Sequence, residues 1–236
     1  GKGVGTALKH YAANNGENHR NYKNSEIDER TLFEMYLKPF EIALEAEPWT
    51  VMSSYNKLNG AYCNENRRLM RILRERFGFQ GVVISDWCAV KNRAKALKAT
   101  TDLECGYHPA AFLELKDAYE KGFITMEEID ASVERILQLV EKAKTSIRKT
   151  SFTKEERHNN AVRIEEEGIV LLKNEDNVLP LKPGSVIDLF HSQDLERYNG
   201  LGSSKVESAA GIKEIQDALI DCGFQVNNNF SHENVY

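Results

Sequence analysis

The stretch GVVISDW, Gly81–Trp87, decides how this chain folds. Its apolar run, Val82–Ile84, is typical of a buried strand in a parallel sheet. The run ends in a carboxylate, Asp86, followed by an aromatic ring, Trp87. Barrel and open α/β enzymes place their chemistry at the carboxyl ends of such strands, and an ionised carboxylate is costly to bury there without a partner. Asp86 is therefore the first candidate for a functional residue.

Composition excludes several classes of protein. The 236 residues are 41% hydrophobic and 28% charged, as in an ordinary globular chain, and the formal net charge is −5. A net negative chain argues against nucleic acid as the main partner, and no apolar run is long enough to span a bilayer. We therefore expect neither a nucleic-acid nor a membrane partner. The first residues show neither an initiator Met nor a signal pattern, so we expect the start to be internal.

The four cysteines are far apart, and none belongs to a CxxC pair. This spacing favours free or structural thiols over a metal site or a disulfide framework. We expect no metal and no organic cofactor. Unpaired thiols slightly favour a cytoplasmic compartment, although the sequence leaves the location open.

Strand and helix patterns alternate along the first 105 residues. Apolar runs predict strands at Gly3–Lys9, Thr50–Tyr55, Gly81–Ser85 and Thr101–Glu104. Helical patterns lie between them at Asp28–Ala46, which Pro39 interrupts, Asn66–Phe77 and Ala89–Ala99. Such alternation predicts an α/β fold with a parallel sheet. Because a closed barrel needs eight strand–helix units in about 250 residues, four units indicate half of a barrel or a smaller open sheet.

Three segments follow from these patterns. Residues 1–143 form the barrel half or open sheet with its trailing helices, Pro109–Lys121 and Thr125–Ala143. Residues 144–167 form a linker and a helix, and residues 168–236 begin a second α/β domain that is cut off early. The elements expected in the last segment are strands at Ile169–Leu172, Ser185–Phe190 and Phe224–Val226, a loop at Gly200–Ser204 and a helix at Ala209–Cys222.

Polar residues at the other strand ends are candidates for the same site. Lys9 and His10 are neighbours, so both can reach one pocket only if a bulge or a cis peptide distorts the strand near Lys9–Tyr11. A surface lysine and a half-buried histidine are the alternative. Arg20 lies in a polar loop and offers a fork of donors for hydroxyls or a carboxylate, unless it is simply solvated. Tyr55 ends a strand, where it can hydrogen-bond a carboxylate or merely pack.

Trp87, Asp102 and Glu104 also carry two interpretations. The Trp87 ring is either a platform on which a sugar stacks or a core side chain. Asp102 and Glu104 lie near the end of the fourth strand pattern. One of them could assist as an acid, but a structural hydrogen bond to a loop is the more frequent role for such residues.

Several ordered motifs together resemble glycoside hydrolase family 3, in its branch of β-glucosidases and related exo-acting enzymes. The stretches that match in order are KHYAANNGENHR (Lys9–Arg20), DERTLFEMYLKPF (Asp28–Phe40), VMSSYNKLNG (Val51–Gly60), GFQGVVISDW (Gly78–Trp87) and GIVLLKNEDNVLPL (Gly168–Leu181). The resemblance covers nearly the whole chain and is weakest after Val186. It implies the second half of a (β/α)8 barrel of TIM type, followed by the start of an α/β sandwich domain.

The resemblance also implies roles. Asp86 would be the catalytic nucleophile, and Tyr55 would hydrogen-bond it. The terminal sugar would be bound by Lys9, His10, Arg20, Met52, Tyr55 and Trp87. The family cleaves with retention through a covalent glycosyl-enzyme. The segment NNGENHR stands where the N-acetylglucosaminidase branch has a short Pro-Gly-His segment, which disfavours that branch.

Two parts that the family needs are expected outside this chain. They are the first half of the barrel and the acid/base Glu, which would follow Tyr236. The interpretation is thus a fragment of a retaining exo-β-glycosidase acting on terminal β-D-glucosyl residues, with a β-linked oligosaccharide or glucoside as its substrate partner. The alternatives are a β-xylosidase or other exo-glycosidase of the family and, in another class, a non-catalytic sugar-binding homologue or an inactive fragment.

Overall fold

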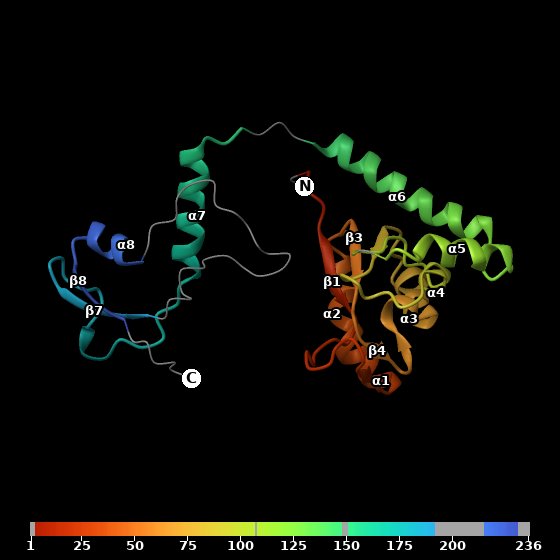
Figure 1. The fold of residues 1–236 in the computed structure, drawn as a ribbon, viewed down its shortest axis with the longest axis horizontal. Helices are drawn as coiled ribbons and strands as arrows, with labels where there is room; N and C mark the ends of the chain where they lie inside the picture. The colour runs from red at the N-terminus through yellow and green to blue at the C-terminus, as the bar shows by residue number, and fades with distance from the viewer. Residues whose placement is uncertain (1–2, 107, 148–150, 192–214, 231–236) are drawn as a thin grey trace. The chain divides into compact units, whose positions relative to one another are not determined.

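The computed structural model describes residues 3–106, 108–147, 151–191 and 215–230 (Figure 1). The chain divides into two compact units, Gly1–Ser151 and Phe152–Tyr236. The finer boundaries at residues 143/144 and 167/168 stay a prediction. No helix among the described residues combines the length and apolarity that crossing a membrane requires.

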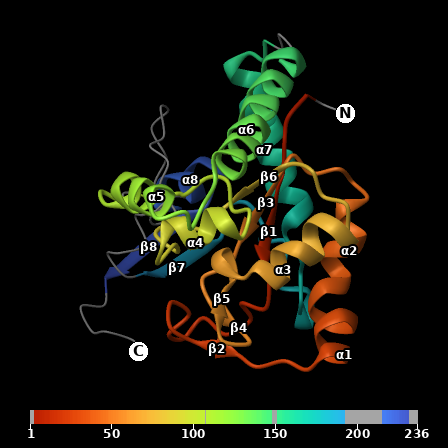
Figure 2. The ribbon, with the colours of Figure 1, turned by 90° about the vertical axis from the view of Figure 1, so that its right-hand side faces the viewer.

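A parallel three-stranded sheet organises the first unit. It consists of β1 (Ala7–Tyr11), β3 (Thr50–Ser53) and β6 (Val82–Ile84) in the order β1-β3-β6. Figure 2 shows these strands side by side. All pairs run parallel, so the carboxyl ends of the strands lie at one edge of the sheet. The alternation of strands and helices predicted from the sequence is the observed α/β arrangement.

The fourth predicted strand, Thr101–Glu104, is reduced to a single bridge between Leu103 and Ile84. The cause is the Asp102 side chain, which replaces a backbone carbonyl as the hydrogen-bond acceptor for β6. A carboxylate oxygen of Asp102 accepts the Val83 N–H at 2.9 Å, while the Thr101 carbonyl accepts from the Arg93 guanidinium at 3.2 Å. The ladder is thereby interrupted at Thr101, while the backbone bonds of Leu103 with Val83 and Ser85 remain.

The end of β1 is distorted, as the sequence predicted. The pairing of β1 with β3 shifts between Leu8 and Tyr11, and the peptide bonds Lys9–His10 and Tyr11–Ala12 are cis. Both the irregular register and the cis peptide expected near Lys9–Tyr11 are therefore confirmed.

Helical segments connect the strands. The predicted helix Asp28–Ala46 comprises α1 (Glu29–Thr31), a π-helical segment (Leu32–Leu37) and α2 (Lys38–Leu44). The wide π-helical segment directly precedes the turn that holds Pro39, whose nitrogen has no hydrogen to donate. The next helical pattern forms α3 (Arg67–Arg71) with a second π-helical segment (Ile72–Arg76), and α4 (Arg93–Lys98) follows β6.

Smaller elements complete the unit. A second sheet joins β2 (Asn24–Ser25), β4 (Lys57–Leu58) and β5 (Ala61–Tyr62), and a 3-10 turn (Cys63–Glu65) follows. Two further helices are α5 (Ala111–Glu120) and α6 (Met126–Ser146). The predicted capping box is present, since Thr125 and Glu128 bond reciprocally at the start of α6.

The core of the first unit lies between the sheet and its helices. Buried apolar side chains of the strands pack against buried ones of the helical segments; they include Tyr11, Val51, Val83, Leu37, Leu69 and Leu73. The Tyr11 ring meets that of Phe40 edge-on, with centroids 5.0 Å apart. This packing fixes the strands, and with them the strand ends, as one rigid body.

The second unit contains α7 (Lys154–Gly168), a 3-10 turn (Glu175–Asn177), the parallel strands β7 (Val186–His191) and β8 (Gln225–Phe230), and α8 (Ile215–Asp221). The predicted strand Ile169–Leu172 is wrong: this segment is irregular, because no neighbouring strand among the described residues supplies it with a ladder. The predicted loop Gly200–Ser204 and the first part of the predicted helix Ala209–Cys222 lie outside the described residues.

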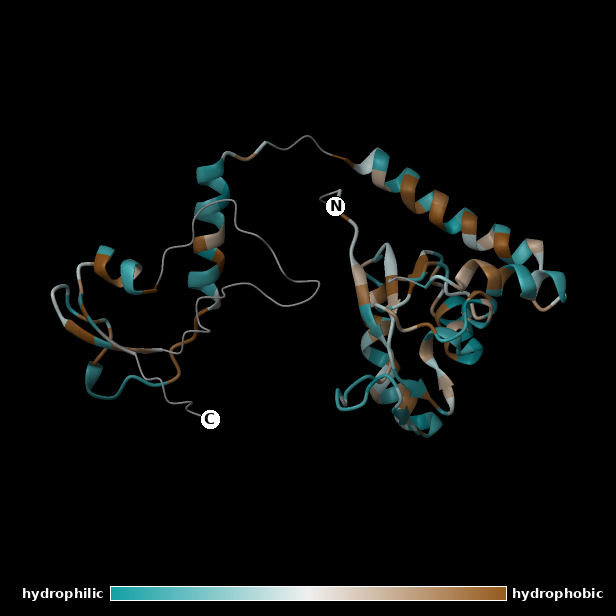
Figure 3. Cartoon of the chain, in the orientation of Figure 1, coloured by the Kyte–Doolittle hydropathy of each residue, from teal (hydrophilic) through white to brown (hydrophobic). Residues whose placement is uncertain are grey.

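Apolar side chains of this second unit remain uncovered. No residue between 152 and 190 or between 215 and 227 is buried. Hydrophobic positions along β7 and β8 are visible in brown in Figure 3. A sheet of two strands is too small to bury a core of its own.

Candidate active site

Asp86 lies two residues beyond β6, at the carboxyl edge of the sheet, and is 7% exposed. Its Oδ1 accepts the backbone N–H of Trp87 at 2.8 Å. Its Oδ2 lies 3.4 Å from Nε2 of His10. The preceding turn is fixed by Ser85, whose hydroxyl donates to the Asp86 carbonyl and accepts from the Cys105 N–H. The carboxylate is thus held in a defined orientation beside groups from two other strands.

Tyr55 lies two residues beyond β3, where its hydroxyl can hydrogen-bond the side chain of Asp86. Burial, together with this hydrogen bond and the charge of Asp86, raises the pKa of Tyr55 to about 12. The hydroxyl therefore keeps its proton near neutral pH, and it can serve Asp86 as a donor.

His10 brings the end of β1 into the same group. Burial lowers the pKa of His10 below its ordinary value of 6.5, whereas the charge of Asp86 opposes this shift. The ammonium of Lys9 lowers the His10 pKa further, so the two neighbours act within one electrostatic environment. The imidazole is consequently neutral near pH 7, with one nitrogen able to donate and one able to accept. Lys9 itself is exposed.

Arg20 reaches the site from the loop after β1. Its guanidinium lies over the Tyr55 ring, 4.2 Å from the centroid. Its Nη1 donates to Oε2 of Glu17 at 2.8 Å. The sequence singled out Arg20 but not the structural role of Glu17, although the spacing of three residues between them was a signal.

Met52 and Trp87 differ in their exposure to solvent. Met52 is half-buried in β3 and pairs in register with Ile84 of β6. Trp87 follows Asp86 directly, and 55% of its surface is exposed. The core interpretation of Trp87 is therefore wrong, and its ring is free to contact a ligand.

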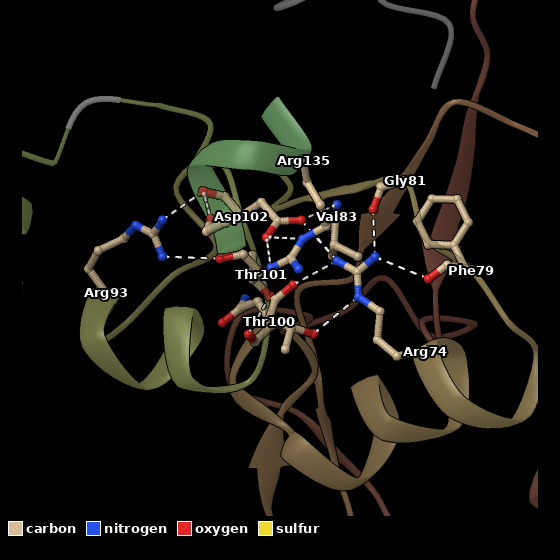
Figure 4. A network of polar contacts seen from close by, with 11 residues as sticks. Arg74, Phe79, Gly81, Val83, Arg93, Thr100, Thr101, Asp102 and Arg135 are labelled. Carbon is tan, nitrogen blue, oxygen red and sulfur yellow. Dashed lines mark hydrogen bonds and ion pairs between the residues drawn. The ribbon is translucent and has the colours of Figure 1, made fainter. Parts of the chain in front are cut away.

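Asp102 belongs to a different arrangement, shown in Figure 4. Its Oδ2 accepts from Arg74 at 2.9 Å and from the Val83 N–H at 2.9 Å. Its Oδ1 accepts two bonds from Arg135, at 2.9 and 2.7 Å. The Asp102 carbonyl also accepts from Arg93. The structural interpretation of Asp102 is thus confirmed: it ties α6 and the helical segment before β6 to the sheet.

Glu104 is engaged as well. Its Oε1 lies 2.8 Å from Nδ1 of His108, and its Oε2 lies 3.9 Å from Nε of Arg93. His108 in turn lies 3.3 Å from Glu114 at the start of α5. Glu104 therefore connects the segment after the sheet to α4 and α5.

Comparison with known proteins matches this architecture. Residues 1–139 fit the model of the family described as glycosyl hydrolase family 3 N terminal domain. The chain is 41% identical over 210 residues, 87% of its length, to the thermostable β-glucosidase B of Acetivibrio thermocellus. The chain belongs to glycoside hydrolase family 3. It is also 36% identical over 240 residues, 95% of its length, to an exo-α-(1→6)-L-arabinopyranosidase of Bifidobacterium longum.

Solved structures of family members agree. A β-glucosidase 3B from Thermotoga neapolitana in complex with α-D-glucose matches with a TM-score of 0.80 and 35% identity over 95% of this chain. A β-glucosidase from Kluyveromyces marxianus in complex with glucose matches with a TM-score of 0.81 and 27% identity over 99%. The chain spans only part of these family members: 28% of the A. thermocellus protein, 31% of the B. longum protein and 33% and 30% of the two structures.

Proposed function

We propose that this chain is the nucleophile-bearing part of a retaining exo-acting β-glucosidase that removes terminal non-reducing β-D-glucosyl residues. The observation that carries the proposal is the convergence of three strand ends on one carboxylate. His10, the penultimate residue of β1, and Tyr55, two residues beyond β3, both lie beside Asp86, two residues beyond β6. A largely buried carboxylate that neighbouring donors hold in one orientation is suited to nucleophilic attack.

The reaction is a double displacement. A carboxylate oxygen of Asp86 bonds to the anomeric carbon while the glycosidic C–O bond breaks, and an acid protonates the leaving oxygen. Water then attacks the anomeric carbon, gives its proton to the same group, and the bond to Asp86 breaks. No metal or organic cofactor takes part in this scheme.

The neighbouring residues hold the sugar and the nucleophile. Tyr55 donates to Asp86 and limits its rotation. Lys9, His10 and Arg20 offer N–H donors to the sugar hydroxyls, which is the chemistry that hydroxyl recognition needs. Met52 lines the sugar pocket, and the exposed ring of Trp87 provides a flat face for the sugar.

The proposal requires groups outside this chain. Retaining hydrolysis needs two carboxyl groups about 5–5.5 Å apart. We assign the second one, a Glu, to the sequence after Tyr236, and further sugar contacts to the missing barrel half. Residues 1–236 alone should therefore fail to turn over aryl β-glucosides. Robust turnover by this chain alone would place the acid within it, at Glu17 or Glu104.

Labelling of the nucleophile tests the proposal. The completed enzyme is here this chain joined to the missing portions, taken from its own protein or from the A. thermocellus relative. A 2-fluoro β-glucoside should inactivate it and label Asp86 alone, as peptide mass spectrometry would show. Label on Asp102 or Glu104 would move the nucleophile, and an absence of both turnover and labelling would favour the non-catalytic, sugar-binding alternative.

A pentosidase is the second candidate, favoured by the 36% identity to an exo-α-(1→6)-L-arabinopyranosidase. A pentopyranose lacks the C6 group of glucose, so the two activities differ in what surrounds that carbon. Comparison of kcat/KM for aryl β-glucoside, β-xyloside and α-L-arabinopyranoside in the completed enzyme decides between them. A higher kcat/KM for a pentoside than for the glucoside would favour the pentosidase over the β-glucosidase.

A further inference from the structure

Glu17 occupies a central position in the loop after β1. Its Oε2 accepts from Arg20 Nη1 at 2.8 Å, and its Oε1 accepts from Asn14 Nδ2 at 3.1 Å. Its backbone carbonyl also accepts the Arg20 N–H at 3.2 Å. The two carboxylate oxygens of Glu17 thus connect Asn14 and Arg20 within the loop.

The pair is too exposed to be explained by stability alone. The side chains of Arg20 and Glu17 are 41% and 63% exposed. Exposed ion pairs contribute little to folding, typically ~0–1 kcal/mol. What the pair does fix is the direction of the guanidinium, whose plane lies over the Tyr55 ring.

A continuous series of contacts then leads to the proposed nucleophile. Glu17 holds Arg20, Arg20 covers the Tyr55 ring, and the Tyr55 hydroxyl lies beside Asp86. Arg20 has five N–H donors, and Glu17 engages one nitrogen. The remaining donors keep a fixed orientation in which they can meet sugar hydroxyls.

We propose that Glu17 is a positioning residue, which acts through Arg20 to orient the guanidinium over Tyr55 for binding of the terminal sugar. This inference rests on the proposed function. Without the Glu17 carboxylate, Arg20 rotates freely in solvent, and the sugar must order it upon binding. Because Glu17 would act on the sugar only through Arg20, the two residues form one unit in binding energetics.

A double-mutant cycle in the completed enzyme tests this role. Glu17→Ala should lower kcat/KM for an aryl β-glucoside by about tenfold, the worth of roughly one charge-assisted hydrogen bond. Arg20→Ala should lower kcat/KM at least as much as Glu17→Ala does. The loss should be divided between kcat and KM in the same proportion in both variants. The double variant should have the same kcat/KM as Arg20→Ala, because Glu17 has no guanidinium left to orient once Arg20 is removed.

Matched controls separate positioning from a structural effect. Glu34→Ala removes an exposed Arg–Glu pair of the same kind, since Arg30 Nε lies 3.0 Å from Glu34, and should leave kcat/KM unchanged. Glu17→Gln keeps an oxygen acceptor for Arg20 and should recover part of the lost activity. If the midpoint of heat inactivation shows that Glu17→Ala is poorly folded, Glu17→Gln takes its place in the test.

Two results would overturn the inference while leaving the proposed function intact: wild-type kcat/KM in Glu17→Ala, or losses that add up in the double variant. A completed enzyme without turnover would instead refute the proposed function. The affinity for glucose would then be measured for the same four proteins, with the fluorescence of Trp87 as the signal of binding. An affinity that Arg20→Ala lowers and Glu17→Ala does not would overturn the inference in that case too.

Discussion

Two aspartates near the ends of neighbouring strand segments of this sheet have opposite surroundings. Asp102 is 2% exposed and accepts bonds from two arginines and one backbone N–H. Asp86 is 7% exposed, accepts the Trp87 N–H, lies beside the Tyr55 hydroxyl and faces a half-buried histidine at 3.4 Å. Both carboxylates are largely buried, but only Asp102 has permanent cationic partners within hydrogen-bonding distance.

The difference separates structural from functional burial. A buried carboxylate between two guanidinium groups has its charge neutralised and its lone pairs used, so it stabilises the fold and is a poor nucleophile. A carboxylate held by a backbone N–H, a tyrosine and a neutral histidine keeps the capacity to form a new bond. Burial alone would not distinguish them, whereas their partners do.

The largest expected effect lies on the functional side. Asp86→Asn in the completed enzyme should lower kcat for an aryl β-glucoside on the order of 10⁴-fold or more, because an amide oxygen is a poor nucleophile. The temperature at which half of the ligand binding is lost on heating should stay near that of the wild type. Appreciable turnover by this variant would remove Asp86 from the chemistry.

The next effect lies on the structural side. Asp102→Asn should reduce the free energy of unfolding by about 3–5 kcal/mol, because it leaves Arg74 and Arg135 without their shared buried anion. Heat inactivation or chemical denaturation of the completed enzyme measures it. Asp117→Asn, at an exposed pair with Lys121, is the matched control and should change little. Equal stability of Asp102→Asn and wild type would show that the network in Figure 4 contributes nothing to folding.

A smaller effect sharpens the description of the site. Tyr55→Phe keeps the ring under Arg20 but removes the donor to Asp86, and should lower kcat/KM by about ten- to a hundredfold, the worth of a hydrogen bond to a charged group. Steady-state kinetics of the completed enzyme measure the loss. Unchanged kinetics would mean that Tyr55 only packs, the alternative that the sequence left open.

The smallest effect is a pH dependence at His10. Its pKa in the folded protein lies below the ordinary 6.5, so between these values the unfolded chain binds more protons than the folded one. Stability contributed by neutral His10 is therefore fully present above pH 6.5 and is lost as pH falls through the folded pKa. The imidazole resonance followed by NMR should titrate below 6.5, and His10→Asn should flatten the stability profile there. Titration at or above 6.5 would contradict this.

Much of the fold was open to prediction from the sequence. The apolar run before Asp86, the spacing of helical residues and the capping box at Thr125 are local signals, and each gave the right element. The failures involve strands. Ile169–Leu172 has the composition of a strand, but a strand exists only with a neighbour to receive its hydrogen bonds. Thr101–Glu104 lost its ladder to the side chain of Asp102, which no local pattern reveals.

For the site, the sequence by itself determined which residues end the strands. Parallel strands bring their carboxyl ends to one edge, so Asp86, His10 and Tyr55 were expected together before any coordinates. Only the tertiary structure decided what each side chain does there. It paired Glu17 with Arg20, placed Arg20 over Tyr55 and enclosed Asp102 between Arg74 and Arg135. The physical reason is that the position of each strand along the chain follows from local periodicity, whereas the contacts and freedom of a carboxylate depend on partners far away in the chain.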